Sequence, residues 1–285
     1  MILKDIRLDF PVRSSPRYGW GRPAHAQLAE IIGAGRADYA ALLTDFLDHR
    51  ENLTRIPRLQ NQGGPTTPCW INGSLPGLDA VSLYCLLARY RPRRYYEVGI
   101  GNSTLFARRC IDDFGMPTEL VGIDPYAQNA ATEVCTRLVR EPLEELDPAF
   151  FDALQAGDML FIDNSHRVFM NSDATAFFLD ILPRLKSGVV VAIHDIALPW
   201  DYPPEWVERY YSEQYLLAAY LLARGSRFRI LLPNAFVSLD PDLVQILAPL
   251  WSDPALNAEF QPPRPEQLQT GRVETHGSLF WLIVN

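Results

Sequence analysis

The sequence has 285 residues, of which 48% are hydrophobic and 21% charged, and 26 basic against 34 acidic side chains give a formal net charge of −8. This composition predicts a globular chain with a sizeable core, and the negative charge argues against a nucleic-acid partner because phosphate backbones repel such a surface. The sequence has no run of about 18 apolar residues and no apolar leader, so we expect a cytoplasmic protein with no membrane partner.

Residues 1–75 are predicted to form a helical and loop extension, a cap over the main domain of residues 76–285. Apolar residues recur at helical spacings from about Ala24 to Asp48, which indicates one helix there. A passage rich in Gly, Pro, Asn and Thr follows up to Gly77 and indicates a loop. The extension would shape an acceptor pocket, simply pack on the domain, or serve as the arm of a homo-oligomer.

From Leu78 onward short apolar strands alternate with helices, which predicts an α/β fold with a parallel sheet. The last two strands have no crossover helix between them and are expected to form an antiparallel pair at the sheet edge. Helices are expected over residues 78–90, 103–114, 127–133, 148–156, 168–185 and 205–224. Strands are expected over residues 93–100, 119–124, 135–141, 158–163, 188–195, 227–232 and 278–285.

Four cysteines, at positions 69, 85, 110 and 135, have spacings that match no zinc-binding motif. Three of them lie within apolar stretches. We therefore expect small buried core residues rather than metal ligands.

The strongest local signal is the run Glu97-Val98-Gly99-Ile100-Gly101-Asn102-Ser103-Thr104, which ends a predicted strand and begins a helix. Two glycines at such a turn let the backbone approach a ligand, and the first amides of the helix can bind an anionic group. Asp124 ends the next strand, where its carboxylate can accept hydrogen bonds from both hydroxyls of a ribose. Thr104 stands where a dinucleotide motif requires a small residue, and Glu97 suits a cationic ligand. The turn therefore favours S-adenosylmethionine over a nicotinamide dinucleotide.

Ionisable residues follow two further strands that are expected to be neighbours. Asp163 and His166 follow one strand, and His194 and Asp195 follow the other. A histidine there can act as general base toward an acceptor hydroxyl, and we favour His194 or His166 for that role. Alternatively Asp163, Asp195 and His194 would hold a divalent cation such as Mg²⁺ that acidifies the acceptor oxygen. The carboxylates could also simply cap turns.

Together the runs EVGIGNST, GID, FIDNSH and HDI resemble the class I S-adenosylmethionine-dependent methyltransferases, in particular a bacterial branch with His-Asp after the fifth strand. The resemblance covers roughly Leu78 to Asn285. It implies a Rossmann-like fold with a seven-stranded, mostly parallel sheet that ends in an antiparallel strand pair. It also implies a donor site formed by Glu97, Gly99, Gly101, Ser103, Asp124 and Asp163, with Arg140 and Glu141 near the adenine.

The resemblance implies an enzyme that methylates a small or medium-sized hydroxylated acceptor, such as a sugar, glycan or natural product. Metal-dependent relatives carry Asp-Asp or Asp-Asn after the fifth strand, whereas this chain has His194-Asp195. The segment Leu198–Trp206 and the nearby Tyr210, Tyr211, Glu213 and Gln214 would form one wall of the acceptor pocket or pack against the sheet. The alternative hypotheses are N-methylation, an NAD(P)-dependent oxidoreductase and a catalytically silent cofactor-binding module.

Overall fold

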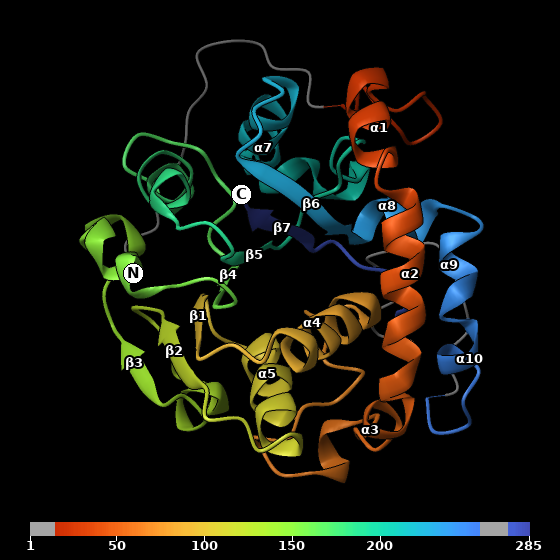
Figure 1. Ribbon diagram of the computed structural model, residues 1–285, viewed down its shortest axis with the longest axis vertical. Helices are drawn as coiled ribbons and strands as arrows, with labels where there is room; N and C mark the ends of the chain where they lie inside the picture. The colour runs from red at the N-terminus through yellow and green to blue at the C-terminus, as the bar shows by residue number, and fades with distance from the viewer. Residues whose placement is uncertain (1–14, 257–272) are drawn as a thin grey trace.

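The computed structural model describes residues 15–256 and 273–285. Its centre is a seven-stranded sheet in the order β3-β2-β1-β4-β5-β7-β6, in which β7 runs antiparallel to both of its neighbours (Figure 1). The predicted mostly parallel sheet with a closing antiparallel pair is therefore confirmed. The strands are β1 (Arg94–Val98), β2 (Glu119–Ile123), β3 (Arg137–Val139), β4 (Met159–Ile162), β5 (Val190–Ile193), β6 (Phe228–Pro233) and β7 (Phe280–Val284).

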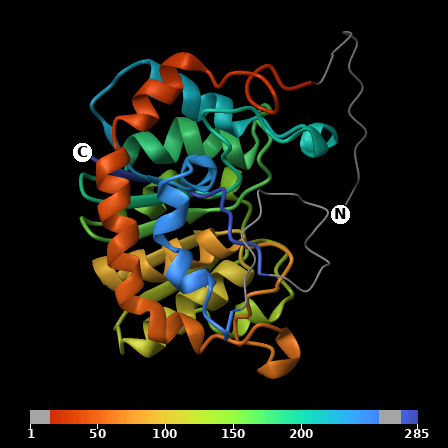
Figure 2. The ribbon, with the colours of Figure 1, turned by 90° about the vertical axis from the view of Figure 1, so that its right-hand side faces the viewer.

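Helices cover both faces of this sheet (Figures 1 and 2). One face carries α4 (Gly77–Tyr90) and α5 (Asn102–Asp113), with α2 (Arg36–Phe46), α3 (Arg50–Thr54), α8 (Asn234–Leu239), α9 (Leu243–Ile246) and α10 (Ala248–Trp251) packed around them. The other face carries α1 (Ala26–Gly33), α6 (Asp173–Ala176) and α7 (Glu213–Leu222). Two core layers result, one on each side of the sheet.

Alternation along the central strands divides side chains between the two layers. Tyr95 and Phe161 belong to the layer under α4, whereas Tyr96, Leu160 and Ile162 belong to the layer under α1 and α7. All of these side chains are buried, which is why the central strands read as continuous apolar runs. The expectation for the cysteines is confirmed, since all four are free and three are buried.

The N-terminal helical stretch is two helices rather than the single predicted one. The break lies at Gly35, where an added Cβ would come within 2.5 Å of the Tyr39 ring. Tyr39 in turn donates a hydrogen bond from its hydroxyl to Ile32 O, at 2.9 Å, at the end of α1. Glycine is thus required at the point where the chain turns from one sheet face to the other.

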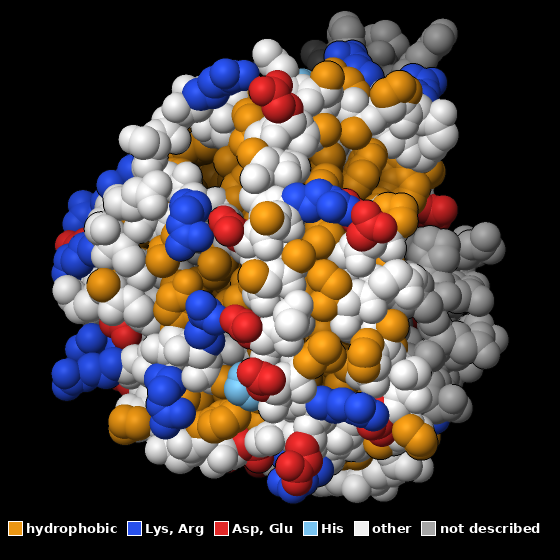
Figure 3. Space-filling model, turned by 45° about the vertical axis from the view of Figure 1, so that its right-hand side comes forward, with side chains coloured by type: hydrophobic (Ala, Val, Ile, Leu, Met, Phe, Trp, Pro, Cys, Tyr) orange, Lys and Arg blue, Asp and Glu red, His pale blue; other side chains and the backbone are white. Residues whose placement is uncertain are grey.

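Helix α2 and the region of α9 lie side by side, although they are about 200 residues apart in the chain (Figures 1 and 2). Ion pairs join the extension to the C-terminal helices, from Arg36 in α2 to Asp240 at 2.8 Å and from Arg50 in α3 to Asp253, after α10, at 2.7 Å. On this face blue and red side chains alternate among apolar ones (Figure 3). Exposed pairs of this kind contribute little stability, so the apolar contacts of α2 anchor the extension.

Two long predicted helices are shorter and irregular. The helix expected over residues 168–185 begins only at Asp173, because Ser172 caps it. It continues as a π-helix and then as a 3-10 turn near Pro183, which has no N–H to donate. The helix expected over residues 205–224 is a 3-10 helix (Pro204–Arg209) and α7, separated by Tyr210 in a left-handed conformation.

Other predicted helices are also short. Residues 127–133 and 148–156 form only the 3-10 helices Ala130–Glu133 and Pro148–Ala153. The Pro-rich stretch before the last strand contains α8, α9 and α10, and its residues 257–272 lie outside the described residues, as do residues 1–14 of the extension. No helix in the described ranges has the length and apolar character needed to cross a bilayer.

Candidate functional site

The turn between β1 and α5 is shaped by its two glycines in different ways. Gly99 has φ +75°, and an added Cβ would lie 2.0 Å from the carbonyl oxygen of Asp163, so the loops after β1 and β4 touch only because this residue is glycine. At Gly101 an added Cβ would meet no protein atom within 4 Å, which leaves the backbone open to a ligand. The Thr104 hydroxyl accepts a hydrogen bond from Gly101 N at 2.9 Å and fixes the start of the helix.

Glu97 lies behind this turn rather than on its open side. The carboxylate is fully buried and accepts a hydrogen bond from the Ser103 hydroxyl, while its Oε2 atom is buried without a hydrogen-bond partner. Burial raises the pKa of Glu97 to about 8, against the opposing effect of the nearby hydroxyl groups of Ser103, Thr104 and Tyr95. Its place indicates that Glu97 supports the turn from within.

A cavity of about 280 Å³, here called the loop cavity, lies at the carboxyl ends of β1 and β2. The half-buried Asp124 faces it, with its carboxylate accepting hydrogen bonds from Tyr126 N at 2.8 Å and Ile100 N at 3.4 Å. The residues that line it are Ser74, Leu75, Gly99, Ile100, Gly101, Asn102, Ser103, Asp124, Asp163 and His194. Of the six residues predicted to form the donor site between Glu97 and Asp163, five therefore line the loop cavity, and Glu97 lies behind them.

Two predicted contacts lie elsewhere. Glu141 is exposed and lines neither of the two cavities described here. Arg140 donates a hydrogen bond to Ala127 O at 2.8 Å, so its guanidinium supports the neighbouring loop. Their predicted contact with an adenine stays a prediction.

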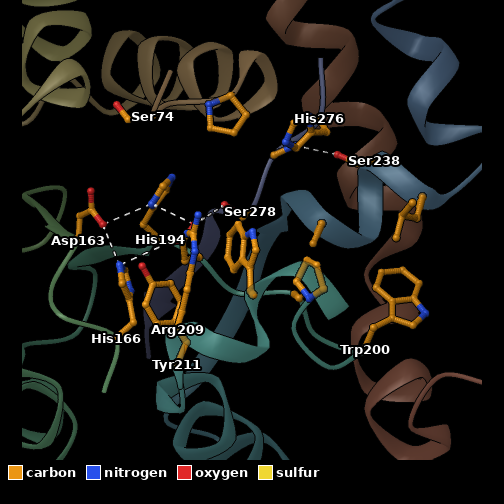
Figure 4. A pocket seen from close by; sticks show the side chains of 18 of the residues that line it. Ser74, Asp163, His166, His194, Trp200, Arg209, Tyr211, Ser238, His276 and Ser278 are labelled. Carbon is orange, nitrogen blue, oxygen red and sulfur yellow. Dashed lines mark hydrogen bonds and ion pairs between the residues drawn. The ribbon is translucent and has the colours of Figure 1, made fainter. Parts of the chain in front are cut away.

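A second cavity of about 320 Å³, here called the aromatic cavity, adjoins the first. Its walls include Trp20, Trp200, Trp206 and Tyr211, with Asp163, His166, His194 and Asp195 at one end (Figure 4). The two cavities share Ser74, Asp163 and His194. Ser74 belongs to the N-terminal extension and accepts a hydrogen bond from Asn102 Nδ2 at 2.8 Å, which ties the extension to the first turn of α5.

His166 connects the loop after β4 with the start of α7. Its Nδ1 lies 2.5 Å from Glu213 Oε1, and its Nε2 lies 3.2 Å from Asp163 Oδ1 and 3.6 Å from Asp195 Oδ2. Its carbonyl oxygen accepts hydrogen bonds from Ser212 N and Glu213 N, at 2.8 and 3.2 Å. These bonds explain why the helix predicted over residues 205–224 is broken before Glu213.

His194 is surrounded by three carboxylates. Its Nδ1 lies 3.4 Å from Asp163 Oδ1 and 3.5 Å from Asp195 Oδ1, and its Nε2 lies 3.4 Å from Asp79 Oδ2. The ring is buried, and neither nitrogen makes a regular hydrogen bond with any described residue. The arrangement is that of an imidazolium held between anions.

These carboxylates govern the protonation of both histidines. Burial alone would lower the pKa of each ring, but Asp163 and Glu213 raise the pKa of His166, and Asp195 and Asp163 raise that of His194, well above the ordinary value. Conversely, burial opposes ionisation of Asp163, yet the two histidines hold the pKa of its carboxyl below its usual range. The carboxylates therefore favour the protonated form of both rings, and the histidines favour the ionised form of Asp163.

Asp79 and Glu213 complete the cluster; the sequence analysis assigned no role to Asp79 and placed Glu213 in a wall of the acceptor pocket or in packing against the sheet. Asp79 is fully buried in the first turn of α4, where its carboxylate accepts hydrogen bonds from Ser278 N and Leu279 N at 2.9 Å and from Asn234 Nδ2 at 2.7 Å. Burial raises the pKa of the Glu213 carboxyl, against the opposing effect of His166. The one available signal for Asp79 was a lone carboxylate within an apolar helix.

His276, to which the sequence assigned nothing, also lines the aromatic cavity. Burial lowers the pKa of His276 to about 4, with Asp79 opposing the shift. In contrast to His166 and His194, this ring is neutral at pH 7.

The predicted metal site is not supported by this geometry. Within residues 15–256 and 273–285, no group of three or more His, Cys, Asp and Glu side chains is placed so that it could hold a metal ion. Asp163, Asp195 and His194 do converge, with His194 Nδ1 3.4 and 3.5 Å from the two carboxylates. The side chains as arranged do not fit Mg²⁺, and the metal stays a prediction.

Comparison with known proteins identifies one segment of the chain. Residues 96–196 match a family described as a methyltransferase domain. An uncharacterised protein of Archaeoglobus fulgidus is 29% identical over 90 residues, which is 30% of this chain and 41% of that protein, so the chain matches about two fifths of that relative's length.

Two solved structures bound to SAH are similar to the chain at low identity. An O-methyltransferase from Bacillus cereus is 14% identical, with 92% of each chain covered and a TM-score of 0.39. The plantazolicin methyltransferase BpumL, in complex with a pentazolic desmethylPZN analog as well as SAH, is 12% identical, with 90% of this chain and 98% of that chain covered and a TM-score of 0.42.

The matched segment runs from β1 to the residue after Asp195 and so contains the glycine turn, Asp124 and both groups of ionisable residues. S-adenosylmethionine is the methyl donor of such domains. The loop cavity is compatible with it, because Gly101 leaves its backbone open and the Asp124 carboxylate on the cavity wall can accept hydrogen bonds from hydroxyl groups. Residues 96–196 are therefore a class I S-adenosylmethionine-dependent methyltransferase domain.

Proposed function

We propose that the protein transfers the methyl group of S-adenosylmethionine to a hydroxyl oxygen of a small or medium-sized acceptor. The observation that carries this proposal is that the loop cavity and the aromatic cavity meet at Ser74, Asp163 and His194. A donor in the first cavity and an acceptor in the second would then approach each other across these side chains. Methyl transfer needs such an in-line approach, and positioning supplies much of the rate enhancement.

The charges at the junction support Asp163 as the group that receives the acceptor proton. A histidine that is already protonated cannot act as a base, and the pKa of both His166 and His194 is raised by the carboxylates around them. Asp163 is ionised and faces both cavities. An oxygen that gains a methyl group while still protonated is strongly acidic, so even a weakly basic carboxylate takes up its proton.

The two histidines then have a positioning role in place of the predicted base role. His194 Nδ1 and His166 Nε2 both lie beside Asp163 Oδ1, at 3.4 and 3.2 Å, and fix the direction in which the carboxylate points. Their positive charges also offset the buried anions of Asp195 and Asp79.

Isothermal titration calorimetry with S-adenosylmethionine and SAH tests the donor part of the proposal. We expect micromolar binding to the whole chain and at least a tenfold loss in Asp124→Ala, because the ribose hydroxyls lose their acceptor. Asp112→Ala, an exposed carboxylate on α5, is the matched control and should bind as the parent does. Absence of binding by the parent protein would refute the proposal, and the same titrations with Mg²⁺ would reveal a metal if one is required.

A further inference from the structure

The large aromatic side chains of the aromatic cavity come from two widely separated parts of the chain. Trp20 comes from the N-terminal extension, and Trp200, Trp206 and Tyr211 come from the segment between β5 and α7. The Trp20 indole N–H donates to Asp201 O at 3.0 Å, which joins the two parts. Trp206 and Tyr211 pack edge to face with ring centres 5.7 Å apart and form a rigid corner. Such walls suit a flat, apolar ring.

Arg209 stands in this corner and lines the cavity. Its guanidinium carbon lies 4.5 Å from the centre of the Trp206 ring and 5.5 Å from that of Tyr211, so both rings hold it in place. Arginines elsewhere on the surface, such as Arg36 and Arg50, pair with carboxylates. Within the described residues the Arg209 guanidinium has no carboxylate partner, and its planar donors remain available to an anion.

This cation lies close to the methyl-transfer end of the cavity. The Tyr211 ring packs on Arg209 on one side and on the His166 ring on another, with ring centres 4.5 Å apart, and His166 contacts Asp163 (Figure 4). A ligand with an anionic group bound to Arg209 would therefore place the opposite side of its ring at the junction with the loop cavity. Trp200 lies at the opposite end (Figure 4).

Positive charge at this end also favours an anion. The carboxylates of Asp163 and Asp195 lie beside the imidazole rings of His166 and His194, at 3.2 and 3.5 Å. Arg209 then contributes an uncompensated positive charge. The sulfonium of a bound donor adds a second one, because S-adenosylmethionine is cationic at its reacting centre.

We propose that the acceptor is a hydroxylated aromatic acid whose ring lies between the aromatic walls of this cavity and whose anionic group is bound by Arg209. This inference rests on the proposed methyltransferase function, since it names the substrate class of the same site. The hydroxyl that receives the methyl group then faces Asp163. A neutral sugar or polyol, which would gain nothing from an unpaired guanidinium, is the competing class.

The test measures binding of matched probes to the whole protein saturated with SAH, followed by quenching of tryptophan fluorescence. The probes are 3-hydroxybenzoate, 4-hydroxybenzoate and 3,4-dihydroxybenzoate, their carboxamides, which have the same shape without the charge, and glucose. We expect at least one acid to bind ten times or more tighter than its amide, a difference of about 1.4 kcal/mol. In Arg209→Gln this ratio should fall to near one.

Arg137→Gln is the matched control, because Arg137 also lies over an aromatic ring, Phe150, at 5.1 Å, but lines neither cavity. It should keep the preference for the acid. The inference is overturned if acids and amides bind alike, if glucose alone binds, or if no aromatic probe binds to protein that does bind SAH. Loss of SAH binding itself would instead refute the proposed methyltransferase function, so the two failures are distinguishable.

Discussion

The buried carboxyl of Glu97 makes a quantitative prediction about stability and pH. Burial raises its pKa from 4.5 to about 8 in the folded chain, so between these values the folded state holds a proton that the unfolded state has released. The contribution of Glu97 to stability is then greatest below about pH 4.5 and decreases as the pH rises to about 8. At about 1.4 kcal/mol per pH unit over about 3.5 units, the decrease is of the order of 5 kcal/mol.

Glu97→Gln removes this dependence, because an amide has the shape of the protonated carboxyl and no proton to lose. The Ser103 hydroxyl can still donate to the amide oxygen, so the turn should keep its conformation. We expect the variant to be close to the parent in stability near pH 5 and more stable by several kcal/mol near pH 8.5.

Urea unfolding followed by tryptophan fluorescence at pH 5, 6.5 and 8.5 measures the difference between variant and parent at each pH. Glu133→Gln, at an exposed position, controls for the loss of one negative charge. If the free energy of unfolding differs between Glu97→Gln and the parent by the same amount at all three pH values, Glu97 does not titrate as its burial requires and the reasoning is refuted.

Three further predictions concern the strand ends. Gly99→Ala should lower the free energy of unfolding by about 2 kcal/mol or more, because the added Cβ would meet the Asp163 carbonyl. Gly101→Ala should fold normally and bind SAH more weakly. Equal effects of the two substitutions on stability and on SAH binding would contradict this prediction. Asp163→Asn should slow methyl transfer about 10²-fold or more in single-turnover assays while SAH affinity changes little, and unchanged turnover would exclude its proton-accepting role. Asp79→Asn should destabilise by about 2–4 kcal/mol in urea unfolding, because an amide donor would face the N–H of Ser278; a parent-like curve would argue against its anchoring role.

The sheet could be predicted from the sequence because its information is local. Each central strand is a short apolar run buried on both faces, and each ends in a residue that the loop chemistry marks, such as Gly99, Asp124 or His194. The rule that parallel strands end at one edge then brings these residues together without any knowledge of side-chain packing. Every predicted strand was found for this reason.

The partners of the histidines could not be predicted, because they come from helices that are distant in sequence. Glu213 lies 47 residues from His166 and begins α7 at the point where the backbone N–H groups of Ser212 and Glu213 donate to the His166 carbonyl. Asp79 contacts His194 from the first turn of α4. A pattern of spacing shows that His166 and His194 lie together, but it does not show that carboxylates surround them and reverse their expected protonation.

The helix errors have the same origin. Apolar periodicity continues through Gly35 and Tyr210, yet the chain turns at both, since Tyr39 packs against Gly35 and Tyr210 adopts a left-handed conformation. Tertiary contacts, not helical propensity, decide where such segments end.

Backbone strain at two neighbouring strand ends connects the fold with the site. His166 and Asp195 both have left-handed backbones, at φ +60° and +55°, which cost of the order of 1 kcal/mol each for residues that are not glycine. Glycine at these positions would remove that cost, so the contacts of the two side chains must compensate for the backbone strain. What they gain is contact: the His166 ring lies within 3.6 Å of Asp195 and 3.2 Å of Asp163, at the edge where the two cavities meet. The strained residues thus hold the His166 ring beside Asp163, the carboxylate among the described residues that lines both cavities, which is the arrangement that the proposed methyl transfer through Asp163 requires.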